Sequence, residues 1–141
     1  MDEIKLHRDF SSINPDDWSR CFAGEAEAGP YYAAAHARAE KNFMAMTVSR
    51  AGVVIAVAPL FTLSYRLDTS LQGPLRTMTN QIARFNDRLL RLDLIGFGSA
   101  LAERCHIGFD PALSEADKRG IFTKMLRCLN DHARQFKIGL V

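Results

Sequence analysis

The clearest hydrophobic pattern lies in the last third of the chain, where a short apolar segment precedes a long amphipathic one. Residues 105–111 are apolar and close on Asp-Pro, which is typical of a buried strand running into a turn. Ser114 and Asp117 form a capping pattern at a helix start, and residues 138–141 predict a second strand, parallel to the first if both join one sheet. The helix repeats apolar residues at helical spacing, at Ile121, Phe122, Met125, Leu126, Leu129, Ala133 and Phe136.

The first third predicts one strand and two helices. Residues 3–10 alternate as a short strand does, and Asn14 caps a helix over residues 15–23 that carries proline at its first position. Residues 24–29 are acidic and contain glycine, which predicts a loop. Proline at position 30 then opens an alanine-rich helix that extends to residue 41.

Two apolar runs in the middle of the chain predict an antiparallel hairpin. Residues 43–49 and 53–63 are separated by Arg50-Ala51-Gly52, where glycine accepts a positive φ at little cost. The second run is almost entirely apolar, so we expect it inside the sheet with both faces covered. Pro59 cannot donate to a strand ladder, and we therefore expect the strand to bend or leave the sheet there.

The remaining patterns complete a mixed architecture. Residues 65–74 predict an exposed loop, residues 77–90 a short amphipathic helix, and residues 92–95 a strand. Helices alternating with apolar strands indicate an α/β (α+β) fold, with a mixed, largely antiparallel central sheet and helices on both faces. A chain of 141 residues corresponds to one domain, residues 1–141.

Composition predicts where the protein works, but it does not predict a reaction. Three cysteines without metal-like spacing, an acidic start without the apolar core of a signal peptide, and no apolar run long enough for a bilayer predict a reduced cytoplasmic protein without a membrane span. Residues 118–137 carry six basic side chains and one acidic one. A solvated helix face explains this excess, because no aromatic residues interleave to stack bases, and we expect no nucleic-acid partner.

Few residues have the spacing of known reactive sites. Gly96 and Gly98 follow a strand as in a phosphate loop, but the next glycine of a dinucleotide-binding pattern is replaced by Leu101, so a plain turn is favoured. Adjacent residues of a strand point to opposite faces, so His106 cannot pair with Cys105, and a core or groove histidine is favoured. No histidines have metal-ligand spacing, and we expect no metal site.

The strand, turn, helix and strand of residues 105–141 resemble the acyl-CoA-binding segment of the GCN5-related N-acetyltransferase (GNAT) fold. With the preceding antiparallel pair, the resemblance covers residues 43–141. The runs Val54-Ile55-Ala56-Val57-Ala58-Pro59-Leu60-Phe61 and Leu101-Ala102-Glu103-Arg104-Cys105-His106-Ile107-Gly108-Phe109 are similar to the N-terminal half of FemAB-like transferases, which carry two such domains in tandem.

The resemblance implies a candidate cofactor site at Lys118, Arg119 and Gly120, where family members hold the acyl-CoA pyrophosphate on backbone amides through a Gln/Arg-x-x-Gly-x-Gly/Ala loop. Asp117 stands at the Gln/Arg position and Phe122 at the small-residue position. A carboxylate repels phosphate and a benzyl group crowds the backbone, so the pattern predicts a degenerate site. Gly120 has a second interpretation, close packing of the helix on the sheet.

Three functional interpretations follow. The first is an acetyltransferase-like domain with a degenerate acyl-CoA site, serving as scaffold or as one wall of an acceptor groove that Ser99 and His106 would line. It implies a companion GNAT-like domain, or a homodimer through the C-terminal strand. The second is an active acetyl-CoA-dependent N-acyltransferase, and the third is a non-enzymatic binding or dimerisation module.

Overall fold

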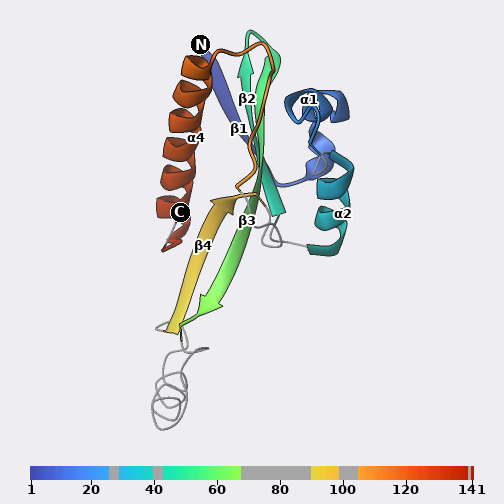
Figure 1. Ribbon diagram of the computed structural model, residues 1–141. Helices are drawn as coiled ribbons and strands as arrows, with labels where there is room; N and C mark the ends of the chain where they lie inside the picture. The colour runs from blue at the N-terminus through green and yellow to red at the C-terminus, as the bar shows by residue number, and fades with distance from the viewer. Residues whose placement is uncertain (26–28, 40–42, 68–89, 99–104, 140) are drawn as a thin grey trace.

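The computed structural model describes residues 1–25, 29–39, 43–67, 90–98, 105–139 and 141. These residues form a mixed α+β fold (Figure 1). Its strands are β1 (Asp2–His7), β2 (Phe43–Arg50), β3 (Val53–Arg66), β4 (Arg91–Phe97) and β5 (Gly108–Phe109). Its helices are the short 3-10 helix η1 (Phe10–Ser12), α1 (Pro15–Cys21), α2 (Gly29–Ala39) and α4 (Glu115–Phe136).

The sheet is antiparallel throughout its described pairs. Its order is β1-β2-β3-β4, and β5 also pairs with β3. β5 pairs with Ala56 and Val57 of β3, whereas β4 pairs with the stretch from Leu60 to Arg66. The two short strands therefore follow one another along the same side of β3, and the predicted, largely antiparallel sheet is confirmed.

Helices cover both faces of the sheet. α4 lies along one face and α1 and α2 lie on the other (Figure 1). The α4 face holds the larger core, formed by Met46, Val48, Ile55, Ala56, Ala58, Leu60, Ile95, Ile121, Met125, Leu129 and Ala133. The opposite face holds a smaller aromatic core, formed by Ile13, Trp18, Cys21, Phe22, Tyr32, Ala45 and Val57.

The turn between β2 and β3 forms as its sequence predicts. Ala51 and Gly52 adopt φ angles of 52° and 80°. Two successive positive φ angles match the right-handed twist of the flanking strands, which is why such turns close two-residue hairpins. From this turn β2 pairs along its whole length with the part of β3 from Val53 to Phe61, with one register shift between Val48 and Ser49.

Pro59 lies inside an unbroken β3, and the predicted bend is wrong. Pro59 pairs with Ala45 of β2 and is fully buried. Its carbonyl accepts a hydrogen bond of 2.7 Å from the N–H of Gly98. The N–H and C=O of a strand residue face the same neighbour, so the missing donor of Pro59 points to the side where β4 has ended and β5 has not begun. The sheet loses no bond to β2.

Other predicted boundaries need correction. The segment of residues 105–111, predicted as a strand running into a turn, contains a strand only at Gly108 and Phe109, and β3 continues to Arg66, through part of the predicted loop. Residues 138–139 form no strand, although the N–H of Gly139 donates to the carbonyl of Asp93 at 2.9 Å. Residues 77–89 of the helix predicted over residues 77–90, and most of the loop before it, lie outside the described residues.

Candidate functional site

The N-terminus of α4 is the place where the resemblance predicts a phosphate-binding site. Ser114 caps the helix: its Oγ accepts from the N–H of Asp117 at 3.1 Å and donates to the carboxylate of Asp117 at 2.6 Å. The hydrogen bond from Ser114 lowers the pKa of Asp117. Glu115, the first residue of the helix, also has a lowered pKa because Lys118 Nζ lies 2.7 Å from its carboxylate. Two carboxylates of the chain itself therefore occupy the positive end of the helix dipole.

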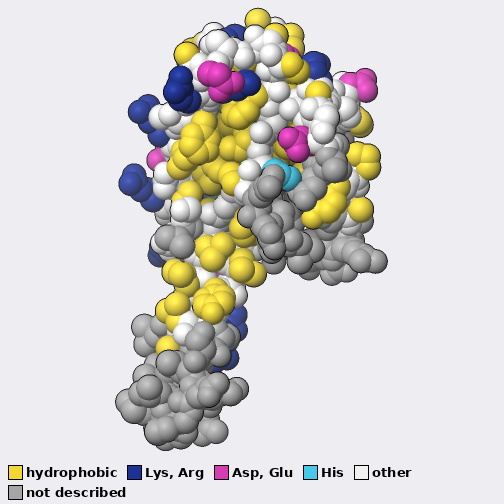
Figure 2. All heavy atoms as spheres, in the orientation of Figure 1, with side chains coloured by type: hydrophobic (Ala, Val, Ile, Leu, Met, Phe, Trp, Pro, Cys, Tyr) yellow, Lys and Arg dark blue, Asp and Glu magenta, His cyan; other side chains and the backbone are white. Residues whose placement is uncertain are grey.

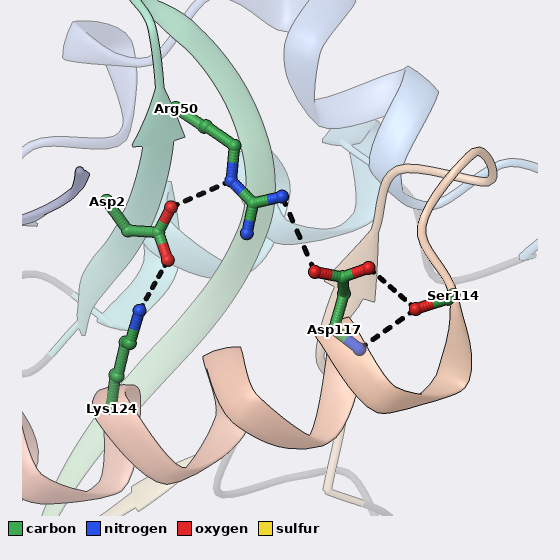
Figure 3. Close-up of polar contacts among 5 residues, drawn as sticks. All are labelled: Asp2, Arg50, Ser114, Asp117 and Lys124. Carbon is green, nitrogen blue, oxygen red and sulfur yellow. Dashed lines mark hydrogen bonds and ion pairs between the residues drawn. The ribbon is translucent and has the colours of Figure 1, made fainter.

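A chain of ion pairs ties this helix start to the sheet (Figure 3). Arg50, at the end of β2, lies 3.5 Å from the Asp117 carboxylate and donates to Asp2 of β1 at 2.8 Å. Lys124 of α4 reaches the other oxygen of Asp2 at 2.6 Å. The hydrogen bonds from Arg50 and Lys124 hold the pKa of Asp2 far below its usual range. The network fixes Asp117 beside the first turn and leaves Arg50 already paired.

Lys118, Arg119 and Gly120 lie within the first turns of α4 rather than on the loop that precedes it. Lys118 is paired with Glu115, and Arg119 is exposed. A Cβ added to Gly120 would meet no atom within 4 Å, so the interpretation of Gly120 as a close contact between helix and sheet is wrong. The loop that faces the helix end consists of residues 110–114.

The sequence pattern places Phe122 among the apolar residues that α4 would pack on the sheet, but the ring is 38% exposed, so the prediction that the helix packs through it is wrong. The helix instead buries Ile121, Met125, Leu129 and Ala133. Phe122 lies at the border of this buried face, with its ring centroid 6.2 Å from that of Phe97.

His106 lies on the opposite side of the sheet from α4, in contact with the aromatic core. Its Nδ1 is 2.7 Å from the hydroxyl of Tyr32, and its ring lies near those of Phe22 and Tyr32. Cys105 is exposed as a residue, but nearby protein atoms partly desolvate its thiol and raise its pKa, which disfavours a nucleophilic thiolate. Ser99, the other predicted groove residue, lies outside the described residues.

The loop before α4 is anchored to α1 by Arg20. Its Nε donates to Asp110 at 3.1 Å, and its Nη2 donates to Asp17 and to the carbonyl of Val54, each at 2.7 Å. Neither this contact nor the pairing of Arg50 with Asp2 was predicted from the sequence. Apart from Asp17, three residues before Arg20, the partners are 34 to 90 residues apart, so no local spacing signals them.

His7 is a buried polar residue whose hydrogen bonds are all internal. Its Nδ1 lies 2.7 Å from Ser12 Oγ and its Nε2 lies 2.9 Å from Thr47 Oγ1. Ser12 donates its hydroxyl proton to the carbonyl of Asp9, so Nδ1 of His7 carries a proton and Nε2 accepts from Thr47. Burial, and then the nearby charge of Lys5, lowers the pKa of His7. The folded protein therefore favours neutral His7.

We expect the free energy of unfolding to fall as the pH drops from about 7 to about 5, because unfolded histidine protonates near pH 6.5 while folded His7 resists protonation. The carboxylates with lowered pKa values, Asp2, Glu115 and Asp117, change the free energy of unfolding only at lower pH. Chemical denaturation across this range measures the slope. A His7→Gln variant should show a flatter profile, whereas His132→Gln on α4 should keep the decline; an unchanged slope in His7→Gln would contradict the assignment.

Within the described residues, no three His, Cys, Asp or Glu side chains are placed to hold a metal ion. In the same ranges, no helix combines the length and apolar character that crossing a bilayer requires. Comparisons of the chain with protein-family models, with curated proteins and with solved structures give no match.

Proposed function

We propose that this chain is an acetyltransferase-like domain of a FemAB-like transferase with a degenerate acyl-CoA site. The observation that carries the proposal is the start of α4, where a strand, a short loop and a capped helix follow one another but the helix end is closed by Asp117 and Glu115. The antiparallel order β1-β2-β3-β4, with helices on both faces, supports the same proposal.

The chemistry of pyrophosphate explains why this helix end does not suit a cofactor. Phosphate binds a helix N-terminus through free backbone N–H groups and the positive dipole end. Here the N–H of Asp117 already donates to Ser114, and two carboxylates stand in the first turn. Arg50 offers no compensating free charge, because Asp2 and Asp117 share its guanidinium. An incoming pyrophosphate would meet like charges.

The proposed role is structural, with one wall of an acceptor groove on the α1 and α2 side of the sheet. His106 supports this role because its imidazole is oriented by the buried Tyr32 beside the interruption between β4 and β5. A companion GNAT-like domain would supply the cofactor and the opposite wall. The acceptor substrate would then be bound by residues of both domains.

Titration calorimetry with acetyl-CoA tests the proposal. We expect no saturable heat from the native chain at micromolar to millimolar ligand. A Glu115→Gln, Asp117→Asn variant should gain at least about tenfold in affinity, because it removes two negative charges from the helix end while keeping an acceptor for Ser114. Tight binding by the native chain would contradict a degenerate site and would favour an active N-acyltransferase.

The control variant also removes two negative charges, but at positions away from the start of α4. Glu3 on β1 and Asp131 in the second half of α4 are exposed. A Glu3→Gln, Asp131→Asn variant should bind acetyl-CoA no better than the native chain. An equal gain in both variants would show that net charge, rather than the closed helix end, sets the affinity, and the proposal would fail.

A further inference from the structure

An apolar surface lies between α4 and the edge of the sheet formed by β4 and β5. On the sheet side it is lined by half-buried Phe97, Ile107, Phe109 and Leu113, and on the helix side by Phe122 and the half-buried Leu126. We call this surface the α4–β4 groove. Figure 2 shows hydrophobic side chains gathered on this face between the helix and the strands. Within the described residues, the core of the α4 face thus continues into partly exposed apolar side chains at this edge.

The strand edge beside the groove has unused backbone groups. In the pairing of β3 with β4, the carbonyl of Asp93 faces away from β3, because it accepts from Gly139 on the open side. By the alternation of an antiparallel pair, the N–H and C=O of Ile95 and Phe97 face the same way. Among the described residues, none donates to or accepts from these groups. An edge of this kind is a template for another strand.

The solvent-exposed side of α4, next to the groove, carries positive charges that no acidic side chain of the described residues pairs with. Arg119, Arg127, Arg134 and Lys137 are exposed, and none forms an ion pair within the described part of the chain. The other lysines of the helix differ, because Lys118 is paired with Glu115 and Lys124 with Asp2. Figure 2 shows basic side chains along the side of the molecule on which α4 lies. We call these four residues the basic stripe.

We propose that the α4–β4 groove docks an extended segment of a partner protein, with apolar residues at its centre and acidic residues at its ends. The segment would hydrogen-bond to Ile95 and Phe97, bury its apolar side chains against Phe97 and Phe122, and place its acidic ends near the basic stripe. A nucleic acid fits less well, because its phosphates gain nothing from an apolar groove and an open backbone edge. The inference does not rest on the proposed function and stands whether or not the chain takes part in acyl transfer.

Fluorescence anisotropy with short labelled peptides tests the inference. The probe is the peptide EEVTITVTEE, whose alternation presents one apolar face, and its matched partner is KKVTITVTKK. We expect saturable binding of the acidic peptide at low salt, at least about tenfold weaker binding of the basic one, and weakening as salt is added. The peptide EEVTIPVTEE, which lacks a central N–H, should also bind more weakly. Equal affinity for the acidic and basic peptides would overturn the proposal.

Variants locate the binding surface. Arg119→Ala with Arg127→Ala should reduce affinity for the acidic peptide at least about tenfold, since it removes two of the four charges of the basic stripe. Lys5→Ala with Arg8→Ala removes the same charge from β1 and its exposed end, at the other edge of the sheet, and should leave affinity unchanged. Circular dichroism confirms that each variant is folded. An unchanged affinity in the α4 variant, or displacement of the peptide by a single-stranded oligonucleotide at lower concentration than by unlabelled peptide, would overturn the proposal.

Discussion

Replacing Leu129 by alanine should lower the free energy of unfolding by about 2–5 kcal/mol, because it removes a completely buried side chain and leaves a cavity. Leu129 lies at the centre of the face that α4 packs on the sheet, together with Ile121, Met125 and Ala133. The same truncation at Phe122 should cost less than about 1 kcal/mol, because the ring is 38% exposed and alanine is the better helix former.

Urea denaturation followed by far-UV circular dichroism measures both variants against the native chain. The comparison is well matched, because both positions belong to the same helix and both carry large apolar side chains. A loss at Phe122 as large as the loss at Leu129 would mean that α4 packs through the ring after all, and the orientation of the helix described above would be wrong.

Replacing Gly108 by alanine should lower the free energy of unfolding by about 1–3 kcal/mol through overpacking. A Cβ at this position would lie 2.6 Å from the ring of Phe22 and 2.9 Å from the backbone carbon of Cys21. The ring has neighbours of its own in the aromatic core, and the backbone of Cys21 belongs to α1. The absence of a side chain at Gly108 is therefore what allows α1 to approach β5.

Gly120→Ala should change the free energy of unfolding in the opposite direction from Gly108→Ala. Its Cβ would meet nothing within 4 Å, and the residue lies inside an α-helix on an exposed face. We expect stabilisation by about 1 kcal/mol, the difference in helix propensity between the two residues. Thermal unfolding of the two variants separates them by sign. Destabilisation by Gly120→Ala would restore the interpretation that this glycine packs closely, and a neutral Gly108→Ala would contradict the tight contact with α1.

Local signals in the sequence predicted the elements that local chemistry controls. Asn14 accepts from the N–H of Asp16 at the start of α1, and Ser114 caps α4, as their positions before proline and before an amphipathic run indicate. The turn at Ala51 and Gly52 likewise follows from its residues. In each case the interacting groups are at most a few residues apart, so the sequence carries the whole signal.

Features that depend on distant residues could not be read in the same way. Phe122 and Leu129 both lie on the broad apolar side of the helical pattern, and only the position of the sheet edge decides which of them is buried. From the sequence alone, Pro59 predicts a break in the strand. In the fold, its missing N–H points to the gap between β4 and β5, so no hydrogen bond to β2 is lost. The carboxylate of Asp117 was predicted to repel phosphate, but its link through Arg50 to Asp2 joins residues far apart in the chain.

The most direct test of the central claim follows the backbone amides of Glu115, Ala116 and Asp117 by NMR while acetyl-CoA is added. If the carboxylates of the chain itself close the start of α4, these amide resonances should keep their positions up to millimolar acetyl-CoA. In the Glu115→Gln, Asp117→Asn variant they should shift with increasing ligand. Saturable shifts of these amides in the native chain would show that the helix end still holds a pyrophosphate, and would contradict the account of a degenerate site.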